Sequence, residues 1–237
     1  MSSDDPADLR AAWDEHSAEW IRWARKPGHD TYWRFGRAAF FAMLPPPGRL
    51  TLDFGCGEGR VSRDLRAAGH RVVALDGSPG LARAARDAEA AIPVLVADAA
   101  RVPLVDAAFD LVVAYMTIHD FDDMRAALAE AARVLAPGGV LCAAVVHPIN
   151  SAGDFTGEDD RAAFVIDESY FEPRSYVDHI ERDGLTMTFS SRHHTLEDYF
   201  TSIADAGLAI QTIREVTAPE GRWIRVPLFL FIRAVKR

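Results

Sequence analysis

The stretch Leu52-Asp53-Phe54-Gly55-Cys56-Gly57-Glu58-Gly59 decides the fold. It lies between a short apolar run, residues 49–54, and a segment of helical character, residues 60–68. Glycines let the backbone turn tightly and approach a ligand closely, and the start of a helix offers unpaired N–H groups. The spacing is G-x-G-x-G and not the dinucleotide-binding G-x-G-x-x-G, so the loop does not imply a bound pyrophosphate.

Apolar runs and helical segments alternate on both sides of this loop. Strands are expected at 49–54, 71–76, 93–97, 109–115 and 140–146, with helices at 60–68, 79–90 and 124–135. Continuous apolar runs are typical of parallel strands that helices cover on both faces. Residues 208–216 and 225–235 read as a final antiparallel pair. The sequence therefore predicts an α/β fold: a doubly wound, Rossmann-like, seven-stranded and mostly parallel sheet with a C-terminal antiparallel strand pair.

Two segments lie outside this alternation of strands and helices. Residues 8–44 read as an aromatic helical cap that ends at Pro45-Pro46-Pro47-Gly48, because proline removes donors and fixes φ. Residues 149–193 are polar and irregular, with a hairpin signal at Asp183-Gly184. Thr195 is expected to cap a last helix over 195–206. We expect a single domain over 1–237, with a cap at 1–48, a core at 49–147, a substrate-cap insertion at 148–194 and a closing unit at 195–237.

Composition and charge narrow the function classes. The 237 residues carry a net charge of −9 with a pI of about 5.3, which argues against a general nucleic-acid binder and against binding to anionic membrane surfaces. No apolar run approaches a membrane span, and the acidic start lacks a signal-peptide pattern, so a cytoplasmic protein is expected. Cys56 and Cys142 are the only cysteines, and they predict neither a disulfide framework nor structural zinc. The sequence leaves open whether the protein forms a homodimer.

Five elements, in order, resemble one known family. The glycine stretch 52–59 is similar to motif I of class I S-adenosylmethionine (SAM)-dependent methyltransferases. Asp76-Gly77-Ser78 resembles their ribose-binding strand end, and Ala97-Asp98-Ala99 resembles their adenine-binding element. Residues 109–113 resemble the family's fourth strand, and residues 130–139 its turn into the fifth. The resemblance covers roughly residues 49–146 and implies SAM as the cofactor.

The resemblance also assigns a cofactor-binding set. Glycines 55, 57 and 59 would lie under the methionine part of SAM, and Asp53 would anchor its ammonium group through water or backbone. Asp76 would hold the ribose and Asp98 the adenine. The strand-end residues Tyr115 and Met116 would lie near the sulfonium, with ordinary packing as the alternative. The full set is Asp53, Gly55, Cys56, Gly57, Gly59, Asp76, Gly77, Ser78, Asp98, Ala99, Tyr115 and Met116. Cys56 is expected to be a small apolar filler.

The residues that would bind and activate the acceptor are predicted from the chemistry and position of their side chains alone. An oxygen acceptor usually needs a base, and histidine titrates near neutral pH. His119, His147 and His194 are the candidate catalytic residues, because they follow strands or precede the late helix near the rim where ligands bind in α/β sheets; the alternative is that they are polar rim residues. Trp20, Tyr32 and Trp33 are candidates for the roof of the pocket for SAM and acceptor, with packing of the aromatic stripe against the sheet as the alternative. The acidic run Asp120, Asp122 and Asp123 is expected to cap a helix, so no metal is expected.

These features favour a methyltransferase that acts on a small-molecule acceptor, with O-methylation ahead of N- or C-methylation. The fourth strand continues Ala114-Tyr115-Met116-Thr117, unlike the Asn/Asp-Pro-Pro-Tyr/Phe motif of DNA amino-methyltransferases. Two alternatives remain, since a fold does not fix a reaction. The chain could use SAM in a cyclisation, hydrolysis or decarboxylation, or it could be a non-catalytic SAM-binding regulatory subunit.

Overall fold

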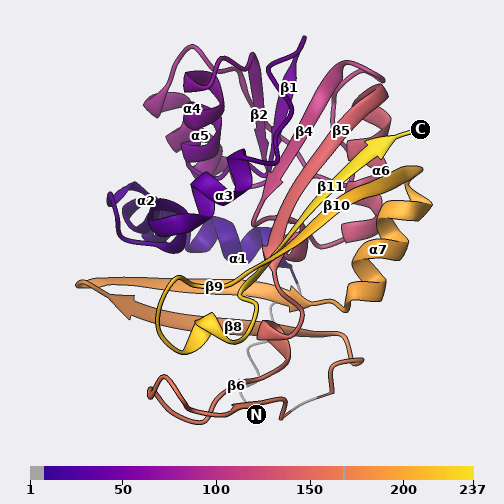
Figure 1. Ribbon diagram of the computed structural model, residues 1–237. Helices are drawn as coiled ribbons and strands as arrows, with labels where there is room; N and C mark the ends of the chain where they lie inside the picture. The colour runs from indigo at the N-terminus through magenta and orange to yellow at the C-terminus, as the bar shows by residue number, and fades with distance from the viewer. Residues whose placement is uncertain (1–7, 168) are drawn as a thin grey trace.

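The computed structural model describes residues 8–167 and 169–237, and a seven-stranded sheet forms its centre (Figure 1). Its strand order is β3-β2-β1-β4-β5-β11-β10. The strands are β1 (Thr51–Phe54), β2 (Val72–Asp76), β3 (Val94–Val96), β4 (Phe109–Tyr115), β5 (Leu135–Val146), β10 (Leu208–Val216) and β11 (Phe229–Lys236). The first five run parallel, whereas β11 is antiparallel to both β5 and β10. The predicted fold class is confirmed.

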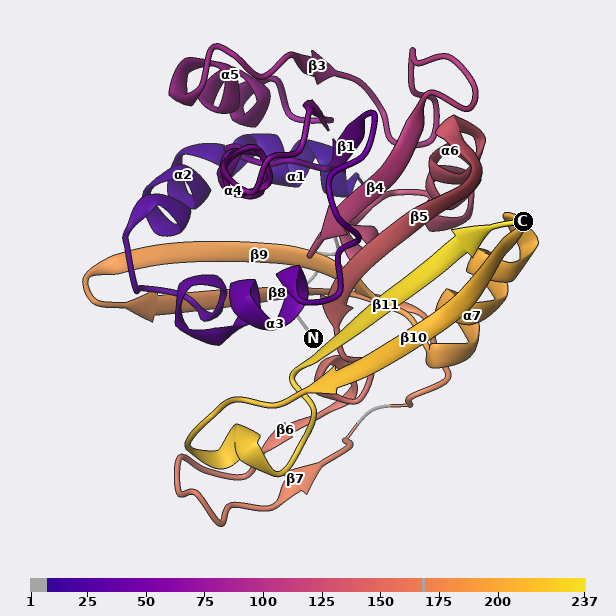
Figure 2. The ribbon, with the colours of Figure 1, turned by 45° about the horizontal axis from the view of Figure 1, so that its top comes forward.

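Helices cover both faces of the sheet (Figures 1 and 2). One face packs against α6 (Met124–Val134) and α7 (Leu196–Asp205), and the other packs against α4 (Arg60–Ala67) and α5 (Pro79–Ala88). Two apolar clusters result, one with Leu128 and Ile203 and the other with Leu65 and Ala85. Burial on both faces explains why the strands read as continuous apolar runs. Within the described residues, no helix is long and apolar enough to cross a membrane.

Local signals fix most element ends, with one exception. Ser78 caps α5 by accepting from the Leu81 N–H, and Pro79 occupies the first turn, as expected. The predicted start of β5 at residue 140 is wrong, because the strand begins at Leu135, where it pairs with Phe109. The Pro-Gly-Gly run therefore lies within β5, next to an irregularity in its pairing with β4. Continued pairing with β4 outweighs the local turn chemistry of this run.

The N-terminal cap is a series of short helices. These are α1 (Leu9–Glu15), α2 (Ser17–Arg25), the π-helical turn η1 (Tyr32–Gly36) and α3 (Arg37–Phe41). Asp14 joins α1 to the core, because its carboxylate accepts from Ser78 Oγ and from the Gly80 N–H, the latter at 3.0 Å. The Leu9 N–H donates to Asp122 Oδ1 at 2.7 Å. The cap is thereby attached at the edge of the sheet where the parallel strands end.

The insertion forms a hairpin that lies beside the cap (Figure 2). Strands β8 (Arg174–Arg182) and β9 (Leu185–His193) are joined by Asp183-Gly184, both at positive φ, as the Asp-Gly signal predicts. Trp13 Nε1 donates to the Ser190 carbonyl at 3.1 Å, and the Thr188 N–H donates to Glu19 at 3.0 Å. Phe189 packs edge-on against Trp13, Trp20 and Trp23. Cap and hairpin therefore close over the same end of the sheet.

The remaining elements are short. They are η2 (Ile118–Asp120), η3 (Asn150–Ala152), η4 (Arg222–Ile224), β6 (Asp154–Phe155) and β7 (Phe164–Val165). Helix η2 directly follows β4 and carries a candidate catalytic histidine. Within the described part of the chain, strands β6 and β7 form a separate two-stranded sheet outside the main one.

The cap of α7 gives a stability prediction. Thr195 accepts from the Asp198 N–H while Asp198 accepts from the Thr195 N–H, so two otherwise unpaired donors are satisfied reciprocally. We expect Thr195→Ala to lower the free energy of unfolding by about 1 kcal/mol. Urea denaturation measures the change, and Thr195→Ser, which keeps the hydroxyl, should stay near the wild type. Equal stability of the alanine variant would show that the cap contributes nothing.

Candidate active site

A cavity of about 1170 Å³ lies where the carboxyl ends of β1, β2 and β4 meet the cap and the hairpin. Its lining includes Gly57 after β1, Asp76 at the end of β2 and Met116 after β4. Trp20 reaches it from α2, and Phe189 reaches it from β9. Open α/β sheets bind ligands at this rim. The predicted enclosure by cap and insertion thus agrees with the lining of the cavity.

The glycine loop forms one floor of this cavity. Gly55, Gly57 and Gly59 have φ values of +82°, +56° and +87°, a region that residues with a side chain seldom adopt. A Cβ atom on Gly57 would lie 3.0 Å from Trp20 Nε1, whereas one on Gly59 would lie 2.9 Å from the Ala85 Cβ. Gly57 therefore keeps the floor of the cavity open, and Gly59 permits the approach of α5.

Asp76 ties the end of β2 to the glycine loop. Its Oδ2 accepts from the Gly57 N–H at 2.7 Å, and its Oδ1 accepts from the Ser78 N–H at 2.8 Å. Burial raises the pKa of this carboxyl to about 6, although the two backbone N–H groups oppose the shift. Each oxygen keeps a lone pair, and the residue lines the cavity. This acceptor pair fits the two hydroxyls of a ribose.

Most of the predicted cofactor set lines this cavity. The lining members are Gly55, Cys56, Gly57, Asp76, Gly77, Ser78, Asp98, Ala99, Tyr115 and Met116. Asp53 does not: its buried carboxylate accepts from Ser62 Oγ on α4, and burial raises its pKa to about 7. Gly59 is also outside the lining. In the structure Asp53 holds α4 and Gly59 permits the approach of α5, and their roles toward the cofactor remain predictions.

The expected aromatic roof is only partly in place. Trp20 lines the cavity, but Tyr32 and Trp33 do not. The Tyr32 hydroxyl donates to Asp64 Oδ2 at 2.5 Å, and Trp33 Nε1 donates to the Ala24 carbonyl at 3.1 Å, so both polar ends are directed to other partners. The lining residues that the sequence analysis missed here are Trp13, Trp23, Phe35 and Arg60. Tryptophans at 13, 20 and 23 recur at helical spacing, which is the signal that could have found them.

Of the three candidate histidines, only His119 lines the cavity. His147 is fully buried elsewhere, with Nε2 3.1 Å from Glu215 and with Nδ1 accepting from the Ile149 N–H. His194 packs edge-on against the Tyr199 ring, and burial lowers its pKa to about 4. Neither residue is part of the cavity lining. The expectation that these two face the acceptor is corrected, because strand-end position alone does not set the direction of a ring.

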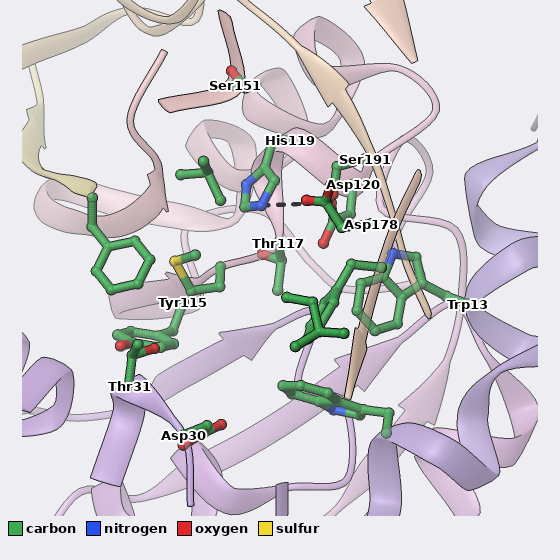
Figure 3. A pocket seen from close by; sticks show the side chains of 18 of the residues that line it. Trp13, Asp30, Thr31, Tyr115, Thr117, His119, Asp120, Ser151, Asp178 and Ser191 are labelled. Atoms are coloured by element: carbon green, nitrogen blue, oxygen red, sulfur yellow. Dashed lines mark hydrogen bonds and ion pairs between the residues drawn. The ribbon is translucent and has the colours of Figure 1, made fainter. Parts of the chain in front are cut away.

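His119 lies beside a carboxyl group that the sequence analysis assigned to helix capping (Figure 3). Asp123 does cap α6, through the Ala126 N–H, and Asp122 holds the Leu9 N–H. Asp120 instead faces the cavity, with Oδ1 3.6 Å from His119 Nε2. Ser191 Oγ of the hairpin donates to the same oxygen at 2.6 Å. One wall of the cavity therefore carries a histidine, a carboxyl group and a serine.

Comparisons with known proteins identify the family. Residues 52–143 match the model of the methyltransferase domain family. A malonyl-[acyl-carrier protein] O-methyltransferase of Enterobacter lignolyticus is 32% identical over 200 residues, covering 82% of this chain and 76% of the relative. A demethylmenaquinone methyltransferase of Corynebacterium kroppenstedtii is 34% identical over 114 residues, covering 48% of each chain.

Other relatives match over less of their length. The aligned parts of three further malonyl-[acyl-carrier protein] O-methyltransferases, from Serratia marcescens, Salmonella typhimurium and Yersinia pestis, span 37%, 52% and 35% of those proteins. Among solved structures, a SAM-dependent methyltransferase from Mesorhizobium loti has a TM-score of 0.68 at 24% identity, covering 87% of this chain and 98% of that chain. It supports the fold alone. Because the Enterobacter relative is matched over most of its length, the chain belongs to the class I SAM-dependent methyltransferases.

Proposed function

We propose that this protein transfers a methyl group from SAM to an oxygen atom of a small-molecule acceptor. The observation that carries the proposal is the single cavity that joins the Gly57–Asp76 floor to the wall formed by His119, Asp120 and Ser191. One part of this cavity fits the cofactor, and the other presents groups that can accept or donate a proton. Malonyl-[acyl-carrier protein] O-methyltransferases among the relatives support an oxygen acceptor.

Different residues along the cavity would bind the cofactor, limit the access of water and orient the acceptor. When bound, SAM supplies an electrophilic methyl group. Gly57 leaves room for the cofactor, Asp76 would hold its ribose and Asp98 its adenine, which together fix its position on the floor. Phe189 of the hairpin packs against Trp13 and Trp20 of the cap beside the floor, so cap and hairpin would limit the access of water to the bound cofactor. The acceptor would enter between this closure and the His119 wall, where it is oriented for attack in line with the methyl group.

A labelled-methyl screen tests the proposal. Purified protein is incubated with SAM that carries a tritiated methyl group and, separately, with malonyl-coenzyme A, reduced demethylmenaquinone and catechol. We expect label in at least one hydroxyl or carboxyl acceptor, as an alkali-labile ester or a stable ether. Label on carbon or nitrogen would overturn O-methylation. SAM binding without any methyl release would contradict methyl transfer and would support the non-methylating or regulatory alternatives.

Removal of divalent metal ions should not change activity. Asp122 and Asp123 use their carboxylates to hold backbone N–H groups, and Asp120 accepts from Ser191, so these oxygens already have partners inside the protein. We expect full activity in EDTA and no gain on addition of Mg²⁺, measured with the acceptor found in the screen. Activity that falls in EDTA and returns with Mg²⁺ would contradict the helix-capping interpretation and indicate a metal-assisted reaction.

A further inference from the structure

The wall formed by His119, Asp120 and Ser191 holds two groups that could take a proton, and their surroundings differ. His119 and Asp120 belong to η2, whereas Ser191 comes from β9. Only 4% of the His119 side chain and 10% of the Asp120 side chain are exposed, and both residues line the cavity. His119 Nδ1 is buried with no hydrogen-bond partner in the part of the chain that the structure describes. Figure 3 shows the imidazole and the carboxyl group side by side.

We propose that Asp120, and not His119, receives the proton of a hydroxyl acceptor, while Ser191 positions its carboxyl group. The proposal rests on the proposed function, because it assigns the base of that methyl transfer. Its geometric basis is that Asp120 Oδ1 is held by Ser191 Oγ at 2.6 Å and lies 3.6 Å from His119 Nε2. No described hydrogen bond uses Asp120 Oδ2, so this oxygen stays available to an acceptor hydroxyl in the cavity.

Burial separates the proton affinities of the two groups in opposite directions. It lowers the pKa of His119 to about 3, with the nearby His194 adding to the shift, so His119 is neutral and a weak base. It raises the pKa of Asp120 well above its ordinary value, against the opposing hydrogen bond from Ser191. A base is most effective when its pKa lies near the working pH. The buried carboxylate is therefore the better proton acceptor of the pair.

Among the residues that the structure describes, no cationic group shifts the pKa of Asp120, although Arg174 of β8 lines the same cavity. Tyr176 of β8 and Tyr199 of α7 face it, and burial raises the pKa of both phenols, so both are neutral at physiological pH. His194, before α7, has a pKa lowered to about 4 and is neutral as well. Asp178 of β8 lines the same cavity and adds negative charge when ionised. Burial therefore determines the raised pKa of the Asp120 carboxyl group, and the Ser191 hydrogen bond opposes it.

The proposed step balances as a single displacement. The acceptor O–H proton moves to the ionised Asp120 carboxylate, and the oxygen lone pair forms the new bond to the methyl carbon. The bond between sulfur and that carbon breaks, and its electron pair returns to sulfur, which leaves S-adenosylhomocysteine. The proton then passes from Asp120 to solvent when the products leave. Because the base must be ionised, turnover should rise with pH through the raised pKa of Asp120.

Infrared titration of the free protein tests where the proton resides. Burial also raises the pKa values of Asp53 and Asp76, so several protonated-carboxyl bands should persist above the pH range of an ordinary aspartate. One component of these bands should be missing in Asp120→Asn and present in the cavity variant Asp178→Asn. Ser191→Ala should move the midpoint of this component to higher pH, because the lost hydroxyl stabilised the ionised form. Unchanged bands in Asp120→Asn, or a midpoint of this component in the ordinary range, would overturn the proposal.

Kinetics with tritiated SAM and catechol separate the two candidate bases. We expect Asp120→Asn to lower turnover at least ~10²-fold with unchanged SAM affinity by calorimetry, and His119→Gln to keep most of the turnover. The reverse order, or an equal loss in Asp178→Asn, would overturn the assignment. If the wild type methylates neither catechol nor any acceptor of the labelled-methyl screen, the proposed function fails, while the infrared titration still decides whether Asp120 holds the proton.

Discussion

Replacing Gly57 with valine is expected to abolish SAM binding while the fold survives. Gly57 has a φ of +56°, and a β-branched residue is strongly disfavoured in this region. Its Cβ would also lie 3.0 Å from Trp20 Nε1, with the two methyl groups of valine extending further into the cavity. A shift of the backbone to relieve this strain would break the hydrogen bond from the Gly57 N–H to Asp76. Space, loop conformation and the position of Asp76 are thus lost together.

Gly138 provides a matched control for backbone strain. It has a φ of +76°, and a Cβ at this position would have no neighbour within 4 Å. Gly138→Val therefore introduces comparable strain in β5, away from the cavity lining. Calorimetry should show no measurable SAM binding by Gly57→Val and wild-type affinity for Gly138→Val, with circular dichroism confirming that both are folded. Binding by the Gly57 variant at wild-type affinity would mean that the cofactor does not lie on this loop.

The core of the fold could be predicted because its signals are local. The strands are apolar runs, and Ser78 followed by Pro79 marks the start of α5 in the sequence itself. The start of β5 was missed because Pro137-Gly138-Gly139 normally ends an element. There, pairing of Leu135 with Phe109 extends the strand. Strand pairing joins residues that are far apart in the sequence, so the composition of residues 135–139 alone does not reveal it.

The cofactor half of the candidate site could also be predicted from local signals, whereas the acceptor half could not. The cofactor half is built from strand ends and the glycine loop, which the chain order brings together, so ten of its twelve predicted residues line the cavity. The acceptor half depends on a distant contact, because Ser191 lies 71 residues after Asp120. Histidines were preferred there for their ordinary pKa. The sequence does not show which side chains are buried, and burial lowers the pKa of His119 and raises that of Asp120.

The second large effect is expected from Asp76→Ala, which should weaken SAM binding about tenfold to a hundredfold. The ionised carboxylate can accept both ribose hydroxyls, and each such charge-assisted hydrogen bond contributes about 1.5–3 kcal/mol. Water replaces part of this loss in the variant, which limits the effect. The variant also leaves the N–H groups of Gly57 and Ser78 without their acceptor, so its stability must be measured beside its affinity.

Asp198→Ala controls for that loss of backbone partners. Asp198 also accepts from a backbone N–H, that of Thr195 at 2.8 Å, but it lies outside the cavity lining. This variant should lose stability and keep its SAM affinity. Equal affinity of Asp76→Ala and the wild type in calorimetry, with the fold intact, would show that the ribose is held elsewhere.

The pH dependence of SAM binding tests the same carboxylate without mutation. Burial raises the pKa of Asp76 to about 6 in the free protein, and a protonated carboxyl offers fewer acceptor sites than the carboxylate. Binding to the ionised form therefore requires loss of a proton below this pKa, and affinity should fall as the pH decreases through about 6. Asp76→Ala lacks the titrating group and should bind with a flatter profile. If the two profiles fall in parallel, another group controls the pH dependence, and Asp76 does not contact the cofactor as an ionised carboxylate.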